Sequence, residues 1–132
     1  MLAAQLRPQQ AILSVRDPIR LSDFSEPQPD VAVLRWRADY YEGALPGPED
    51  VLLLIEVADT SADVDRAVKL PLYAAGGIQE VWLVDPEAGS VDVSTGPGPE
   101  GYAHSRRCAA DERLEVARIG DVSIAVRELL GG

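Results

Sequence analysis

Residues that commonly build metal sites and disulfides are scarce in this sequence. Its 132 residues include one cysteine, Cys108, and one histidine, His104. A single cysteine excludes an intramolecular disulfide and a cysteine-rich zinc module, and it fits a reducing compartment. The single histidine excludes most histidine-based metal sites. His104 and Cys108 lie four residues apart on an expected strand without a second ligand pair, so we expect no zinc site there.

Positive charge and long apolar runs are also scarce. Lysine and arginine total 12 against 22 aspartate and glutamate residues, which gives a net charge of −10. This balance argues against a protein that grips nucleic acid with its whole surface or binds an anionic membrane. No segment approaches the roughly 18 apolar residues of a membrane span, and the first residues lack a secretory signal pattern. We therefore expect a soluble, cytoplasmic protein without membrane attachment.

The residues that are present have the composition of one globular domain. Hydrophobic residues make up 46% of the chain, and no linker is long enough to separate a second domain, so we expect residues 1–132 to form a single domain. The run 51–57 is apolar without alternation, which indicates a central strand covered on both faces. Apolar segments predict strands at 11–15, 18–21, 31–36, 51–57, 80–85, 90–94 and 102–108.

A helix is expected between the two most apolar strands. Thr60 and Ser61 are suitable N-caps, Gly76 and Gly77 end the helix, and Pro71 should kink it or break one hydrogen bond. Its expected apolar face consists of Val64, Val68, Leu72 and Ala75.

This crossover makes the strands at 51–57 and 80–85 parallel neighbours, while the other strands are expected to be antiparallel. We therefore predict a mixed-sheet α/β or α+β domain with one main crossover helix. The remaining expectations are an exposed connection at 39–50, a loop tip at 96–101 and a short amphipathic helix at 122–130.

An acidic residue inside the most apolar strand is the first candidate for chemistry. Burying the Glu56 carboxylate costs several kcal/mol unless it is paired, hydrogen-bonded or bound to a metal. The alternative is that strand alternation leaves Glu56 solvated at the rim. Asp30 immediately precedes the strand at 31–36 and is either a turn residue or a second ligand. Two carboxylates at the ends of neighbouring strands would form a natural Mg²⁺ site.

Lys69 is the only lysine beside eleven arginines. It lies on the helix that follows Glu56, and Asp65, Lys69 and Tyr73 share one helical face. A surface ion pair is the simplest interpretation, although arginine would serve that purpose at least as well. The alternative is metal-assisted phosphodiester hydrolysis. In that reaction Asp30 and Glu56 hold Mg²⁺ while Lys69 positions or deprotonates a water.

Three segments together resemble one known family. They are Ser-Glu-Pro-Gln-Pro-Asp-Val-Ala-Val-Leu at 25–34, Leu-Leu-Ile-Glu-Val-Ala-Asp-Thr-Ser at 53–61 and Asp-Arg-Ala-Val-Lys-Leu-Pro-Leu-Tyr-Ala-Ala-Gly-Gly-Ile-Gln-Glu-Val-Trp-Leu-Val-Asp at 65–85. In this order they are similar to the Uma-type endonucleases, small proteins of the PD-(D/E)XK superfamily. The resemblance covers roughly residues 11–130.

The resemblance implies a restriction endonuclease-like fold and an endonuclease that uses Mg²⁺, or alternatively Mn²⁺, to cleave DNA. Asp30 and Glu56 match the family's acidic ligands, and the Val57 carbonyl would be a third ligand. Ala58 stands where the usual motif places its lysine, and Lys69 matches the family lysine that has moved onto the following helix. The side chains expected to support this site are Asp65 and Tyr73.

The amino-terminal region departs from the family pattern. Members usually begin with a complete helix and strand that add an acidic residue to the site, but 2–8 contains neither Asp nor Glu. We expect this helix to be largely missing, which would expose apolar surface and favour a homodimer. Two hypotheses follow: an active nuclease, or an inactive relative that serves as an interaction or regulatory module. In the first, DNA contacts would depend on Arg16, Arg20, Arg35, Arg37 and Arg66.

Overall fold

The structure is a computed structural model that describes most of the chain. The described residues are 11–15, 18–21, 27, 29–39, 41, 43–57, 62–115 and 123–129, with the side chains of 62–68 and 128 outside the description. None of the helices in this part of the chain is long and apolar enough to cross a membrane.

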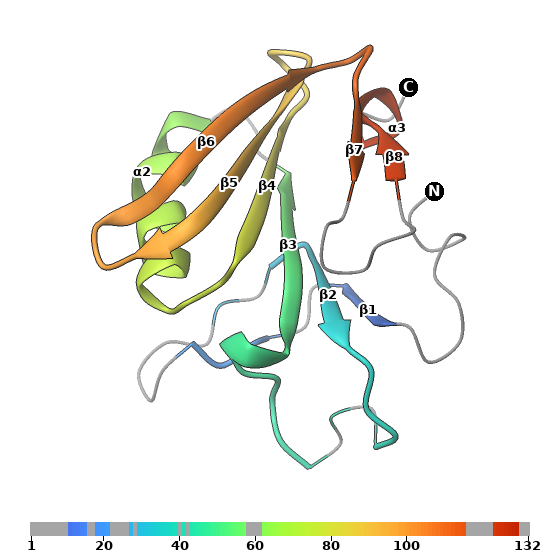
Figure 1. Cartoon of the computed structure of the whole chain (residues 1–132), viewed down its shortest axis with the longest axis vertical. Coiled ribbons are helices and arrows are strands. Elements are labelled where there is room, and N and C mark those ends of the chain that lie inside the picture. Colours follow the sequence, from blue (N-terminus) through green and yellow to red (C-terminus); the bar gives the residue numbers. More distant parts are fainter. Residues whose placement is uncertain are drawn as a thin grey trace.

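A mixed six-stranded sheet forms the centre of the molecule (Figure 1). β3 (Val51–Val57) and β4 (Glu80–Asp85) are parallel, and every other neighbouring pair in this sheet is antiparallel. The parallel pair is connected through helix α2 (Ala62–Ala75), as the sequence predicts. The strand order is β1 (Ala11–Val15), β2 (Val31–Arg35), β3 (Val51–Val57), β4 (Glu80–Asp85), β5 (Ser90–Gly98) and β6 (Gly101–Ala109).

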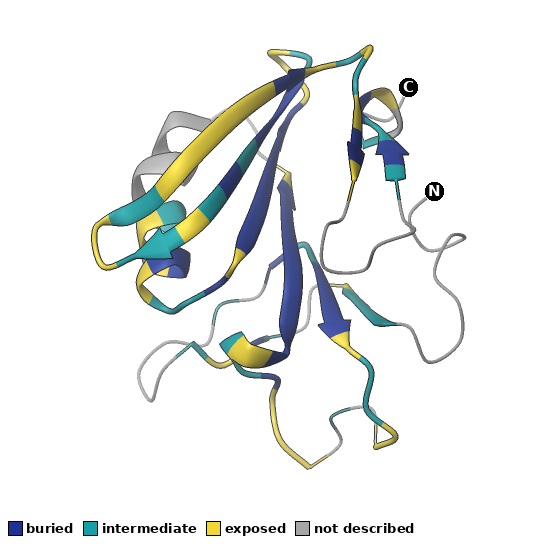
Figure 2. Ribbon diagram, in the orientation of Figure 1, coloured by how far each residue is buried: buried dark blue, intermediate teal, exposed yellow. Residues whose placement is uncertain are grey.

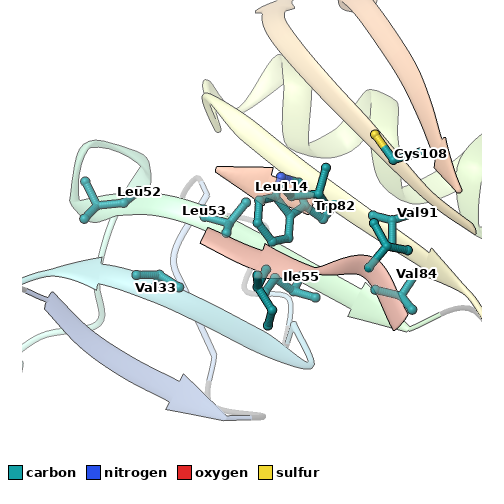
Figure 3. Close-up of a cluster of buried hydrophobic side chains, with 11 residues drawn as sticks. Val33, Leu52, Leu53, Ile55, Trp82, Val84, Val91, Cys108 and Leu114 are labelled. Atoms are coloured by element: carbon teal, nitrogen blue, oxygen red, sulfur yellow. The ribbon is translucent and has the colours of Figure 1, made fainter. Parts of the chain in front are cut away.

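Both faces of the central strand β3 are covered. Because side chains alternate along a strand, Leu54 belongs to one apolar cluster while Leu53 and Ile55 belong to another. The first cluster includes Tyr73 of α2. The second includes Trp82 and is shown in Figure 3. The prediction of a central strand buried on both sides is therefore confirmed.

A small carboxyl-terminal unit covers the second cluster. It consists of β7 (Arg113–Glu115), β8 (Ser123–Ala125) and α3 (Val126–Leu129). Leu114 and Ile124 are paired across β7 and β8 and are both buried in the cluster. The helix predicted over 122–130 is therefore wrong at 123–125, because these residues complete a two-stranded sheet with β7, an element that the sequence did not suggest.

Helix α2 is present where expected, but its buried face differs from the prediction. Leu72 is 40% exposed, whereas Tyr73 is 1% exposed. Ala75 is exposed and Ala74 is buried. Assigning Leu72 and Ala75 to the apolar face is therefore wrong. The reason is that the Tyr73 ring packs in the first cluster, which turns its neighbours outward.

The end of α2 follows the predicted glycine signal. The Ile78 N–H donates to the Tyr73 carbonyl at 3.0 Å, and the Gly77 N–H donates to the Ala74 carbonyl at 3.1 Å. Gly77 has φ of 90°, in the left-handed region that favours glycine. Pro71 lies inside the helix, which continues through it to Ala75.

Residues 18–21 form no strand, contrary to prediction. The Ile19 N–H donates to the Pro27 carbonyl at 3.0 Å, and the Arg20 N–H donates to the Pro46 carbonyl at 2.8 Å. These two N–H groups therefore donate to loop carbonyls and do not pair with a neighbouring strand.

Two connections are also more ordered than predicted. The turn between β5 and β6 comprises only Pro99 and Glu100, so the expected loop at 96–101 is mostly strand. In the connection before β3, the 3-10 helix η1 (Pro48–Asp50) ends at a buried carboxylate that forms an ion pair with Arg35.

Candidate active site

Strand pairing brings Asp30 and Glu56 to the same end of the sheet. β2 is antiparallel to β3, with Val31 opposite Ile55. Asp30 precedes β2 and Glu56 follows Ile55, so the two acidic residues lie beside each other at the carboxyl end of β3. This is the arrangement that the sequence suggested for a pair of carboxylates on neighbouring strands.

The Glu56 carboxylate is buried and receives two side chains from α2. Glu56 is only 3% exposed. The Tyr73 hydroxyl donates to Oε1 at 2.6 Å, and the Lys69 ammonium donates to Oε2 at 3.3 Å. Lys69 and Tyr73 are four residues apart, so one helical face directs both toward this carboxylate. The interpretation of Glu56 as a solvated rim residue is therefore wrong.

The Asp30 carboxylate is held by the backbone at the end of β3. Its Oδ2 accepts a hydrogen bond from the Val57 N–H at 2.8 Å. The sequence did not suggest this contact, because it depends on the register of β2 against β3. It restricts where the Asp30 carboxylate can lie relative to Glu56.

The surroundings of Glu56 shift its pKa in opposing directions. Burial raises the pKa of the Glu56 carboxyl, and the nearby charge of Asp30 raises it further. The hydrogen bond from Tyr73 and the charge of Lys69 lower this pKa, but the net direction is upward. Burial and the adjacent carboxylate also raise the pKa of Tyr73, so its hydroxyl stays a hydrogen-bond donor at neutral pH.

Comparison with known proteins connects this geometry to a family. The family model Uma2, described as a putative restriction endonuclease, matches residues 1–127. The chain belongs to the Uma2 family. No protein in a curated collection matches it.

A solved structure supports the fold independently. A protein from Anabaena variabilis, titled a putative nuclease belonging to DUF820, superposes with a TM-score of 0.70 at 16% sequence identity. The match covers 98% of this chain and 72% of that one. At this identity the likeness shows the fold, which is the restriction endonuclease-like α+β fold that the sequence resemblance implied.

The donors at this end of the Uma2-family sheet suit a hard divalent cation. Restriction endonuclease-like families generally use divalent metals. Among the described residues, no group of three or more His, Cys, Asp or Glu side chains is placed to hold a metal. Mg²⁺ is usually bound by one or two carboxylates together with several waters. Asp30 and Glu56 supply two neighbouring carboxylates, and a cation between them would offset the repulsion by which Asp30 raises the pKa of Glu56.

Most of the site residues that the sequence suggested come together in this Uma2-family structure. Asp30, Glu56, Lys69 and Tyr73 are connected through the hydrogen bonds above, and Val57 contributes its N–H. The side chain of Asp65 lies outside the described residues. Tyr73, expected only to support the site, makes the shortest described contact to Glu56.

Proposed function

We propose that this protein is a Mg²⁺-dependent endonuclease that hydrolyses phosphodiester bonds of DNA. The observation that carries the proposal is the convergence of Lys69 and Tyr73 on the buried carboxylate of Glu56, with Asp30 anchored at the same strand end. Family membership and the nuclease fold support hydrolysis of nucleic acid, and the restriction endonuclease description favours DNA as the substrate.

Each residue has a distinct role in this proposal. Asp30, Glu56 and the Val57 carbonyl would hold Mg²⁺, which polarises the phosphate and lowers the pKa of a water when bound. Lys69 contacts Glu56 while its side chain remains 42% exposed, so its ammonium can also reach a substrate phosphate or the attacking water. Tyr73 keeps the Glu56 carboxylate in place by donating to its Oε1.

Cleavage of labelled DNA in the presence of Mg²⁺ or Mn²⁺ tests the proposal. Duplex DNA, single-stranded DNA and RNA of one sequence would be compared. We expect Glu56→Gln and Lys69→Ala each to lower the cleavage rate by about 100-fold or more, because the first weakens the proposed Mg²⁺ site and the second removes the cation proposed to act on the phosphate or the water. Glu100→Gln, in the exposed turn after β5, removes the same charge and should cleave like the wild type.

Cleavage that survives both active-site substitutions would contradict the proposal and indicate another site. A wild-type protein that cleaves none of the three substrates would favour the alternative, a nuclease fold that serves as an interaction or regulatory module. The net charge of −10 is the observation that favours this alternative.

A homodimer is part of the same proposal, since a second copy would extend the surface available for DNA. Sedimentation velocity at several protein concentrations would test it. A species of constant monomer mass across the range would contradict it.

A further inference from the structure

The two outer strands of the six-stranded sheet differ in how they are protected against pairing with another strand. An edge strand presents unpaired N–H and C=O groups, and natural proteins commonly protect such edges with charged side chains, prolines or bulges. At one edge, β6 carries His104, Arg106 and Arg107, which are all exposed. Figure 2 shows that most of this strand is exposed. The two arginine charges disfavour pairing of β6 with an apolar strand.

β1, at the other edge, has no such protection. Its sequence, Ala-Ile-Leu-Ser-Val at 11–15, contains neither a charged residue nor a proline, and its pairing with β2 contains no bulge. In the described part of the chain, no strand pairs with its outer edge. Residues 11–14 are only half-buried, and Val15 is 56% exposed. β1 is therefore open to pairing with one further strand.

The charges described beside β1 are paired with carboxylates. Arg35, at the end of the neighbouring strand β2, forms an ion pair with Asp50. Arg37 follows β2 and forms an ion pair with Asp39 at 3.0 Å. Arg16, which follows β1, lies outside the described residues. A strand that approaches β1 therefore meets an edge without charge, although the chain as a whole carries −10.

Apolar surface continues from β1 onto its surroundings. Among the described residues, four large apolar side chains are exposed, and they include Val15 on β1 and Leu45 near it. A cavity of about 280 Å³ opens beside the strand and is lined by residues of β1 together with Leu34 and Leu45. Exposed apolar surface of this kind is typical of a site of protein association.

The strand is complementary to a second copy of itself. Successive residues direct their backbone groups to opposite edges of a strand, so an antiparallel pair of identical strands places even residues opposite even and odd opposite odd. The register that pairs all five residues puts Leu13 opposite Leu13 of the second copy. Ala11 is then opposite Val15, and Ile12 is opposite Ser14. No charge faces another charge, and on one face every pair is apolar.

We propose that two copies of this chain associate through antiparallel pairing of β1, with the two-fold axis at Leu13. This inference rests on the homodimer in the proposed function and names the surface that forms it. The pairing would join two six-stranded sheets and satisfy the backbone groups at the outer edge of β1. Because each copy carries a net charge of −10, association is least opposed where charge is absent, and β1 meets that condition.

Cysteine cross-linking tests the register directly. Leu13→Cys would place two thiols on the two-fold axis, where copper-phenanthroline should oxidise them to a disulfide between the copies. Val15→Cys is the control. In the proposed register the two copies of residue 15 lie four residues apart along the strands, or about 13 Å, which is too far for a disulfide. The native Cys108 is fully buried, so the wild type should form no cross-link.

We expect a cross-linked dimer of Leu13→Cys on a non-reducing gel, and none of Val15→Cys alone, although Val15 is well exposed. A mixture of Ala11→Cys and Val15→Cys should form the cross-linked dimer, because these positions are opposite each other. Cross-linking of Val15→Cys alone to the same extent as Leu13→Cys would overturn the proposed register and indicate random collision.

A charge at the two-fold axis tests the same surface without oxidation. Leu13→Lys would bring two ammonium groups together, and sedimentation velocity should show a dimer dissociation constant about tenfold or more above that of the wild type. Leu72→Lys makes the same change on α2, where the side chain is 40% exposed, and should dimerise like the wild type. Thermal unfolding of each variant would establish that it is folded. Wild-type affinity in folded Leu13→Lys would overturn the proposal.

The failure of this interface can be distinguished from the failure of the proposed function. A wild type that stays monomeric overturns both the homodimer and the β1 interface, whatever it cleaves. A wild-type dimer without the Leu13→Cys cross-link overturns the interface alone. If the cross-link forms but cleavage does not depend on Glu56 and Lys69, the proposed reaction site is wrong and the β1 interface stands.

Discussion

At the scale of single residues, Glu56 combines burial with two cooperating donors. Its carboxylate is almost inaccessible to solvent, and hydrogen bonds from Tyr73 and Lys69 compensate for part of the cost of burying it. The compensation is incomplete, because the pKa of Glu56 is still raised. The folded state therefore binds a proton at Glu56 more tightly than the unfolded chain does, and Glu56 stabilises the fold most at low pH. This contribution is lost as pH rises through the folded-state pKa.

Tyr73→Phe should therefore destabilise the protein in a pH-dependent manner. Without the hydroxyl, the ionised Glu56 loses a donor, and its pKa rises further. We expect a loss of about 1–3 kcal/mol in the free energy of unfolding at pH 8, and a smaller loss near pH 4.5, where more of Glu56 is protonated. Urea unfolding at several pH values would measure both.

Tyr102→Phe is the matched control. The Tyr102 hydroxyl donates to the neutral Ile78 carbonyl at 2.8 Å, so its removal should cost about 1 kcal/mol at every pH. An equal cost of Tyr73→Phe at pH 4.5 and pH 8 would contradict the role given to Glu56.

At the scale of elements, α2 connects the fold to the candidate site. One face of this helix contributes both Lys69 and Tyr73 to Glu56, and the Tyr73 ring also packs in the core. The position of these side chains depends on where the helix ends. That end is fixed by Gly77, whose backbone lies in the left-handed region.

Gly77→Ala should destabilise the protein by about 1–2 kcal/mol. A methyl group at this position meets only Pro48, at 4.0 Å, so the cost comes from the backbone conformation rather than from a clash. Gly43→Ala is the control, because its backbone is not left-handed and the added methyl group contacts nothing within 4 Å. Chemical denaturation of both variants would check this, and equal midpoints for Gly77→Ala and wild type would refute it.

At the scale of the whole molecule, the net charge of −10 and the acidic pair both destabilise the folded state. Negative charges repel one another across the fold, and Asp30 and Glu56 add a local repulsion. A divalent cation that binds only the folded state would relieve this repulsion and raise stability.

Mg²⁺ should therefore raise the melting temperature of the wild type. At ten times the dissociation constant the gain is about 1.4 kcal/mol, or roughly 3–6 °C for a domain of this size. Differential scanning fluorimetry at matched ionic strength would compare the wild type, Glu56→Gln and Glu100→Gln. The increase should disappear only in Glu56→Gln. An equal increase in all three proteins would show that Mg²⁺ merely screens the surface.

Much of this architecture is visible in the sequence because it depends on local patterns. The continuous apolar run of β3, the helix signals around α2 and the glycines that end it each act within a few residues. The secondary-structure predictions are wrong where contacts between distant segments determine the local structure. The carbonyl partners of Ile19 and Arg20 come from separate loops, and β8 forms because Ile124 can pair with Leu114.

The candidate site likewise combines features that the local sequence predicts with features that depend on distant segments. The sequence by itself indicated the candidate side chains, because Glu56 in an apolar strand and a single lysine one helix later are local features. Only the tertiary structure decided that the Val57 N–H anchors Asp30, and that Arg35 lies at the opposite end of β2 from Glu56. The physical reason is strand register, which pairs residues far apart in the chain and sets which end and which face each side chain occupies.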